Sequence, residues 1–217
     1  MNPPTREAAW AILVEYTQSQ PLRRHALAVE AAMRTLARSR GVVDSAEVER
    51  WGIVGMVHDF DYERWPTEEG HVWRGMEILQ QRGWPEDVIR AVGAHAPYTG
   101  IEPQTLMEKG ILAADELTGF VGACALVRPS KRIADLPVES VLKRMKEKAF
   151  ARSVDRRCVL RGAEVWGTPL GELTALVIRS QIPIAERLGL AGVPAPLLPE
   201  DPVPDVPEPP EASGQSA

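Results

Sequence analysis

The chain has 217 residues, of which 44% are hydrophobic and 25% are charged, a composition typical of a soluble globular protein. This length suits one domain with its own core and a modest extension. The formal net charge is −5, but residues 193–217 carry five acids and no lysine or arginine. Residues 1–192 are therefore close to neutral, and the lack of a basic excess argues against a nucleic-acid-binding protein.

Cysteine usage and the absence of targeting segments predict the compartment. Cys124 and Cys158 fall in apolar helical stretches, so we expect two buried thiols in a reducing compartment rather than a disulfide framework. The N-terminal segment lacks a basic stretch followed by an apolar one, and no apolar run is long enough to span a bilayer. These features predict a soluble cytoplasmic protein without membrane contact.

Apolar residues recur at three- and four-residue spacing along most of the chain, which predicts an all-α domain over residues 1–192. Thr5 is a typical helix N-cap, and Pro21 suits the first turn of a second helix. Residues 60–66 are expected to form a loop. The expected helices cover residues 8–18, 21–40, 46–59, 67–82, 85–95, 104–127, 138–150, 155–166 and 170–188, the last of them interrupted at Pro183.

Residues 193–217 form a tail of different composition, with eight prolines, five acids and a Gly-Ser-rich end. Such a segment buries too little apolar surface to offset its chain entropy, so we expect it to be disordered. A Pro-rich tail can bind a partner, but no recognition motif stands out. An inert solubilising terminus is the simpler interpretation.

A carboxylate within an apolar helix predicts a bound cation. Asp115 lies in such a run, where a buried charge is costly unless a cation or hydrogen bonds satisfy it. The doublet His58-Asp59 ends another apolar helix, where unpaired carbonyls favour a cation. His25 shares the apolar stripe of its helix, and His95 lies at a further predicted helix end. Because imidazole and carboxylate groups suit divalent transition metals, we expect these helices to share a metal site.

The candidate ligands follow one another in a characteristic order along the chain: His25, His58, Asp59, His71, His95 and Asp115. Over residues 20–130 this order resembles the HD superfamily of metal-dependent phosphohydrolases, in particular its branch with a two-metal centre. The resemblance implies a helical bundle around a central metal site. It also implies that Asp59 bridges two divalent cations (Mn, Fe, Co, Ni, Zn or Mg), with His71 and His95 on the second. For His71, a solvated or capping role is the alternative.

The resemblance further implies hydrolysis of a phosphate ester or anhydride in a small phosphorylated molecule or nucleotide, by water that a metal ion activates. Besides Asp59, the nearby acids Asp61 and Glu63 are candidate general bases, or else surface acids in a loop. Arg128 and Lys131 directly follow the Asp115 helix and are candidates to bind the phosphate, or else part of a solvated face.

Two other functions fit the same ligand order. Two-iron oxygenases similar to inositol oxygenase share it, and substrate-dependent oxygen uptake by an iron-loaded protein would identify that chemistry. A binding module with a purely structural metal site is the second alternative, which a lack of activity across many substrates and metals would favour. Neither the substrate nor the oligomeric state follows from the sequence.

Overall fold

The computed structural model describes residues 4–200, which form helices, turns and one isolated β-bridge but no β-strand. The elements are α1 (Arg6–Tyr16), α2 (Gln20–Ser39), α3 (Ser45–Val57), α4 (Trp73–Gln81), α5 (Glu86–Ala94), η1 (Pro97–Thr99), α6 (Leu106–Leu126), η2 (Ile133–Asp135), α7 (Val138–Met145), α8 (Arg156–Trp166), α9 (Leu170–Gln181), η3 (Ile182–Ile184) and α10 (Ala185–Leu188). The predicted all-α fold is confirmed. Over these residues, every helix is too short or too polar to cross a lipid bilayer.

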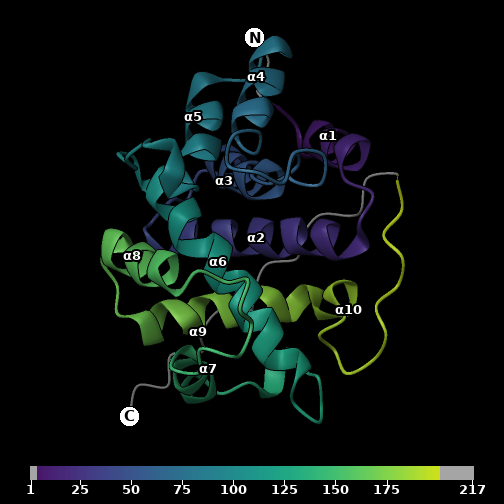
Figure 1. The fold of residues 1–217 in the computed structure, drawn as a ribbon, viewed down its shortest axis with the longest axis vertical. Coiled ribbons are helices and arrows are strands. Elements are labelled where there is room, and N and C mark those ends of the chain that lie inside the picture. The colour runs from purple at the N-terminus through teal and green to yellow at the C-terminus, as the bar shows by residue number, and fades with distance from the viewer. Residues whose placement is uncertain (1–3, 201–217) are drawn as a thin grey trace.

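Two long helices form the centre of the molecule. Figure 1 shows α2 running across the middle, with α3 and α1 on one side of it and α9 on the other, while α6 crosses α2. Apolar side chains on both helices are almost wholly buried, among them Leu27 and Met33 on α2 and Ile111 and Phe120 on α6. Burial of these side chains holds the two helices together, so residues on their facing sides are brought close.

A glycine allows α3 to lie unusually close to α2. A Cβ atom added at Gly55 would lie 2.7 Å from the carbonyl oxygen of Val29, a distance that real side chains do not adopt. The Gly55 carbonyl also accepts a hydrogen bond of 2.8 Å from Nδ1 of His58. This close approach therefore places the end of α3, and the doublet that follows it, against the helix that carries His25.

The helix expected from residue 67 begins later than predicted. Residues 67–72 form turns, and α4 starts only at Trp73. Val72 has a φ of 67°, which a right-handed helix does not accommodate. His71 consequently lies in a turn rather than in a helix. The helix expected over residues 138–150 likewise ends early, at Met145.

The interruption expected at Pro183 is present. The 3₁₀ turn η3 separates α9 from α10 at this position, because proline lacks the N–H that a continuous helix needs.

Part of the expected disordered tail is packed against the domain. Leu198 is buried, and its backbone exchanges two hydrogen bonds with the side chain of Gln20 at 2.9 and 3.2 Å. The indole N–H of Trp10 donates to the carbonyl of Glu200 at 3.0 Å. Residues up to 200 thus lie along α2 and α1, which composition alone did not indicate. The prediction for residues 201–217 lies outside the described part of the chain.

Candidate metal centre

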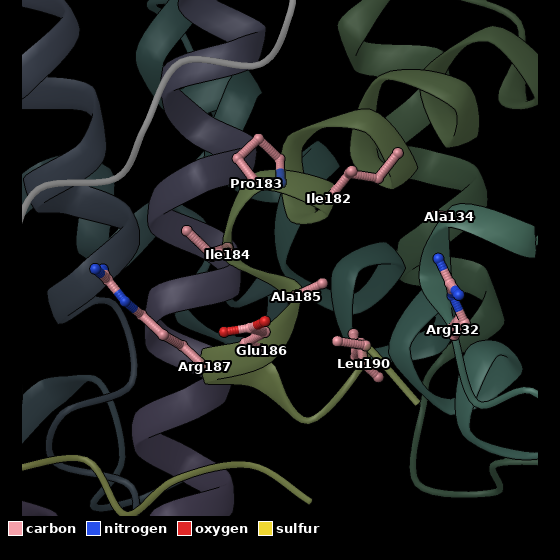
Figure 2. Close-up of a pocket in the computed structure, with 10 residues that line it drawn as sticks. Arg132, Ala134, Ile182, Pro183, Ile184, Ala185, Glu186, Arg187 and Leu190 are labelled. Atoms are coloured by element: carbon pink, nitrogen blue, oxygen red, sulfur yellow. The ribbon is translucent and has the colours of Figure 1, made fainter. Parts of the chain in front are cut away.

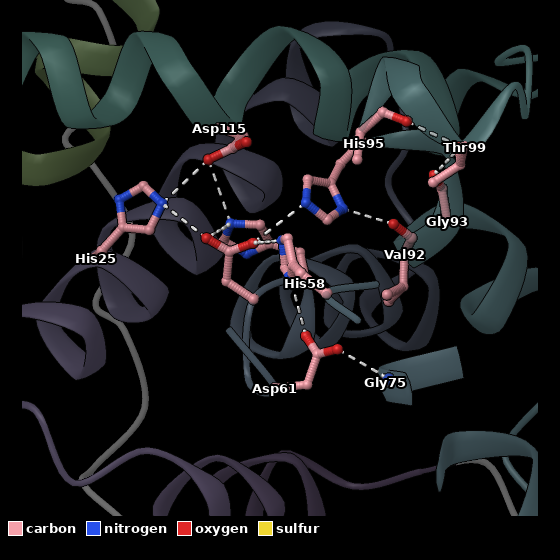
Figure 3. A network of polar contacts seen from close by, with 12 residues as sticks. His25, His58, Asp61, Gly75, Val92, Gly93, His95, Thr99 and Asp115 are labelled. Carbon is pink, nitrogen blue, oxygen red and sulfur yellow. Dashed lines mark hydrogen bonds and ion pairs between the residues drawn. The ribbon is translucent and has the colours of Figure 1, made fainter. Parts of the chain in front are cut away.

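Six side chains lie close together (Figure 3), and they come from α2, α6, the ends of α3 and α5, and the turn before α4. They form two groups, in each of which the ligand atoms lie within 4.8 Å of one another. The first group is His25, Asp115, His58 and Asp59, and the second is Asp59, His71 and His95. The candidate ligands that the sequence indicated are therefore close together in space.

Asp59 lies between the two groups and faces both. Its Oδ1 is 3.1 Å from Nε2 of His71 and 3.1 Å from Nε2 of His95. Its Oδ2 is 3.3 Å from Nε2 of His58. On the far side of the first group, Oδ1 of Asp115 lies 3.1 Å from Nε2 of His25. One carboxylate oxygen of Asp59 is thus available to each group.

Three of the histidines are held in place through their second ring nitrogen. Nδ1 of His58 donates to the Gly55 carbonyl at 2.8 Å, and Nδ1 of His95 donates to the Val92 carbonyl at 2.5 Å. His71 Nδ1 lies 2.9 Å from a carboxylate oxygen of Asp61. Such contacts fix the ring and direct Nε2 toward the cluster, as is usual for metal-binding histidines.

Asp61 supports His71 rather than facing the cluster itself. Its carboxylate is buried, with one oxygen on His71 and the other 2.9 Å from the N–H of Gly75. Both oxygens are therefore occupied, and this geometry does not favour the general-base role that the sequence indicated. Instead, Asp61 connects the turn that carries His71 to the start of α4.

We expect Asp61→Asn to weaken the second metal position selectively. The new amide cannot accept from both His71 and Gly75, so the His71 ring loses its orientation. Loss of such a partner typically lowers metal affinity roughly 10–100-fold. Competition with a chromophoric chelator would measure the two affinities separately. Asp135→Asn, at a half-exposed acid in η2, is the matched control. Equal weakening of both positions would contradict the assignment of Asp61 to His71.

Glu63 also makes a structural contact. Its carboxylate accepts hydrogen bonds from the backbone N–H groups of Gln18 and Ser19, at 2.8 and 2.9 Å. These groups lie at the start of α2, so Glu63 fixes the loop over residues 60–66 to that end of the helix. It is absent from the residues that line the cavity beside the metal cluster.

The basic residues expected to bind phosphate lie far from the cluster. Arg128 follows Asp115 by 13 residues along α6 and its C-cap, which corresponds to roughly 20 Å at the usual helical rise. It lines a different cavity together with Cys124 and Lys143. Lys131 lies beyond it in the following turn, at a φ of 49°. The structure therefore brings neither Arg128 nor Lys131 to the metal cluster.

A cavity of about 410 Å³ opens onto the cluster. Outside the candidate ligands, its polar walls are the side chains of Tyr62, Tyr98, Ser153, Asp155, Cys158 and Glu116. Among the described residues, no lysine or arginine lines it. Burial and, next, the negative charge of Asp115 raise the pKa of Glu116 to about 7. Sequence reasoning missed these wall residues. Only Glu116 could have been expected near the site from the sequence, because it directly follows Asp115.

The two cysteines differ in environment. Cys124 is buried as expected, whereas Cys158 is only half-buried and lines the metal cavity. Burial raises the pKa of the Cys158 thiol to about 11. The thiol is therefore protonated near neutral pH in the metal-free protein, which disfavours a role as nucleophile.

Charges within the cluster strongly shift the pKa values of several of its side chains. Burial by itself lowers the pKa of His58, but the charges of Asp59 and Asp115 outweigh this and raise it well above its usual value. For His71, the hydrogen bonds that its ring donates to Asp59 and Asp61 outweigh burial and raise the pKa from 6.5 to about 9. Conversely, the pKa of Asp59 lies well below its usual value. Burial alone would raise this pKa, but the charge of His58 and the hydrogen bonds from His58, His71 and His95 lower it by more. Without metal ions, a proton on His58 and another on His71 compensate the nearby carboxylates.

We expect metal-free protein to lose stability as pH rises from 6.5 to about 9. In this interval folded His71 binds a proton that the unfolded chain releases, so the free energy of unfolding falls with rising pH. Metal affinity should increase over the same interval, because the ions displace these protons. Thermal unfolding of EDTA-treated protein at several pH values would measure the first effect. A melting temperature that stays level or rises would contradict it.

A second cavity of similar size contains none of the candidate ligands. Its volume is about 420 Å³, and it lies between η2 and α10. Figure 2 shows Arg132 and Arg187 on opposite sides of this region. Cavity size therefore does not select the functional site, whereas the clustering of ligands does.

Residues 22–119 match the family model of the HD domain. The chain carries an HD domain. The match begins just before His25 and ends just after Asp115, so it includes all six candidate ligands. HD domains are generally metal-dependent hydrolases, and the histidine and aspartate groups of this one can hold a metal ion. Neither the curated proteins nor the solved structures include a significant match to the chain.

Proposed function

We propose that this protein is a metal-dependent phosphohydrolase acting on a small phosphorylated molecule or nucleotide. The observation that carries the proposal is the position of Asp59, with one carboxylate oxygen toward each of two histidine-containing groups. Such sharing is what a pair of divalent ions needs when both act on one phosphate.

The donor set fits divalent transition metals. Imidazole nitrogens and carboxylate oxygens suit Mn, Fe, Co, Ni and Zn, and the two groups contain no thiolate. We propose that His25, His58 and Asp115 hold the first ion with Asp59, and that His71 and His95 hold the second with Asp59. Bound ions of this kind polarise a phosphoryl oxygen and lower the pKa of coordinated water.

The rest of the site positions the ligands and shapes the entrance. The contact with Asp61 keeps Nε2 of His71 aimed at Asp59. Tyr98 shields one side of the cluster, with its hydroxyl 3.5 Å from the His71 carbonyl. Because no lysine or arginine of residues 4–200 lines the cavity, we propose that the phosphate is bound by the metal ions themselves.

The test is to purify the protein without added metal, measure its metal content and then screen phosphorylated metabolites. We expect one or two equivalents of a divalent metal, and phosphate release that EDTA abolishes and the metal restores. Absence of phosphate release with every metal and substrate class would contradict the proposal.

The missing basic residues also favour one alternative, a two-iron oxygenase. A cavity walled by tyrosines and carboxylates suits a hydroxylated substrate as well as a phosphorylated one. Iron-loaded protein that consumes oxygen only when substrate is present, and releases no phosphate, would establish this alternative.

A further inference from the structure

One acid that lines the metal cavity, Glu116, belongs to neither ligand group. It directly follows Asp115 on α6, and neighbouring residues of a helix point in directions about 100° apart. Because Asp115 faces His25, Glu116 faces a different wall of the same cavity. That wall includes Asp155 at the start of α8, a helix that packs against α6 (Figure 1). Glu116 is only partly buried, so a molecule bound in the cavity can contact its side chain.

Among residues 4–200, no positive side chain compensates Glu116. It forms no ion pair in that part of the chain, and no lysine or arginine there lines the cavity. The charges that act on it most strongly are those of three acids, Asp115, Asp155 and Asp59. Burial and the charge of Asp115 accordingly raise its pKa to about 7, and a cation beside it would favour the charged carboxylate again.

The second acid of this wall, Asp155, has a partner of its own. Its carboxylate accepts a hydrogen bond from the backbone N–H of Arg157 at 2.8 Å and pairs with the Arg157 guanidinium group at 3.2 Å. The remaining polar side chains of the wall carry hydroxyl or thiol groups, which are neutral near pH 7. Within the described chain, the wall acid left without a counter-charge is therefore Glu116.

The metal ions do not provide that counter-charge once a substrate is bound. Under the proposed function, two divalent ions face the carboxylates of Asp59 and Asp115 and the dianionic phosphate of the substrate. These charges balance one another, so the carboxylate of Glu116 is an additional negative charge. A nucleotide polyphosphate would place further negative charge beside it, whereas a substrate with a positive group would neutralise it.

We propose that the substrate is a phosphate monoester whose organic part carries an ammonium group, and that Glu116 pairs with this group. The inference rests on the proposed function, because it takes the metal centre as the place where the phosphate binds. A cavity of about 410 Å³ has room for a phosphate group and a short aminoalkyl chain together. Glu116 then determines specificity, since it contacts the organic part of the substrate and not the phosphorus atom.

Hydrolysis of two isosteric esters by the zinc-loaded protein tests the inference. Aminoethyl phosphate and propyl phosphate have chains of equal length, but the first ends in an ammonium group where the second has a methyl group. We expect kcat/KM to be roughly 10-fold higher, or more, for the aminoethyl ester, mainly through a lower KM. Equal kcat/KM values, or a preference for propyl phosphate, would overturn the proposal.

Two substitutions localise the recognition of the ammonium group. Glu116→Gln removes the charge and keeps the size, so the preference for the aminoethyl ester should fall to about 2-fold or less. Glu164→Gln removes the same charge from an exposed position on α8 outside the cavity and should retain the full preference. Circular dichroism checks that both variants fold. A preference that persists in folded Glu116→Gln would assign the recognition to another group and overturn the proposal.

Binding of the same two esters separates failure of this inference from failure of the proposed function. Calorimetric titration of the zinc-loaded protein measures their affinities if no phosphate is released. A protein that hydrolyses both esters equally well would retain the proposed function and overturn this inference. A protein that binds the aminoethyl ester more tightly, loses this difference in Glu116→Gln and releases no phosphate would retain the ammonium site while the proposed function fails. Binding of neither ester would overturn the inference.

Discussion

Asp59→Ala should abolish both metal binding and turnover while leaving the helices intact. The substitution removes the one carboxylate whose oxygens lie 3.1 Å from His71 and His95 and 3.3 Å from His58, so neither group keeps its full ligand set. Loss of the ions removes both charge stabilisation and water activation, and we expect kcat/KM to fall by at least ~10³-fold. Metal analysis, circular dichroism and phosphate release would measure the three properties.

Two companion variants make the Asp59 experiment specific. Asp59→Asn keeps the size of the side chain and removes its charge, so it separates the loss of a ligand from the creation of a cavity. Asp135→Ala removes a half-exposed carboxylate in η2 and should leave metal content and turnover unchanged. Full activity in the Asp59→Ala protein would contradict the proposed role of the cluster.

Glu30→Gln should destabilise the whole domain strongly. Glu30 is wholly buried on α2, where its carboxylate oxygens contact Arg6 at 2.6 Å and Arg34 at 3.0 Å. Neutralising it removes the carboxylate that Arg6 and Arg34 share, while Arg34 keeps an ion pair with Glu49 at 2.7 Å. Breaking a buried ion pair in this way typically costs about 3–5 kcal/mol. Urea unfolding would measure the change in the free energy of unfolding.

The matched control is an ion pair at the surface. Glu15 pairs with Arg82 at 2.7 Å, but both side chains are largely exposed to solvent. Solvent screens such pairs, so Glu15→Gln should cost no more than ~1 kcal/mol. Similar losses in the two variants would show that the buried position of Glu30 is not what matters. Glu30 and His25 lie on the same helix, α2. Partial unfolding of the Glu30→Gln variant should therefore also weaken its metal binding.

Much of the ligand set could be predicted from the sequence because it depends on residue type and position within a helix. Asp115 in an apolar run and the doublet at the end of α3 both signal a buried charge that needs a cation. Helical periodicity likewise predicts that His25 faces the core. The structure places all of these side chains in the first group.

The remaining contacts could not be predicted, because neighbours in sequence do not indicate where a side chain points. Asp61 and Glu63 follow the doublet closely, yet one supports His71 and the other holds the start of α2. Arg128 follows the Asp115 helix directly, but the length of that helix carries it to a different cavity. The positive φ of Val72, which directly follows His71, also left no clear sequence pattern.

The sequence by itself determined most of the helices and the chemistry of the ligands, since both arise from local spacing and side-chain type. Only the tertiary structure decided which carboxylates reach the cluster, which basic residues do not, and which side chains form the walls of the cavity beside it. The physical reason is that periodicity fixes the face of each helix, whereas the crossing of α2 with α6 and the close approach of α3 depend on packing across the whole core.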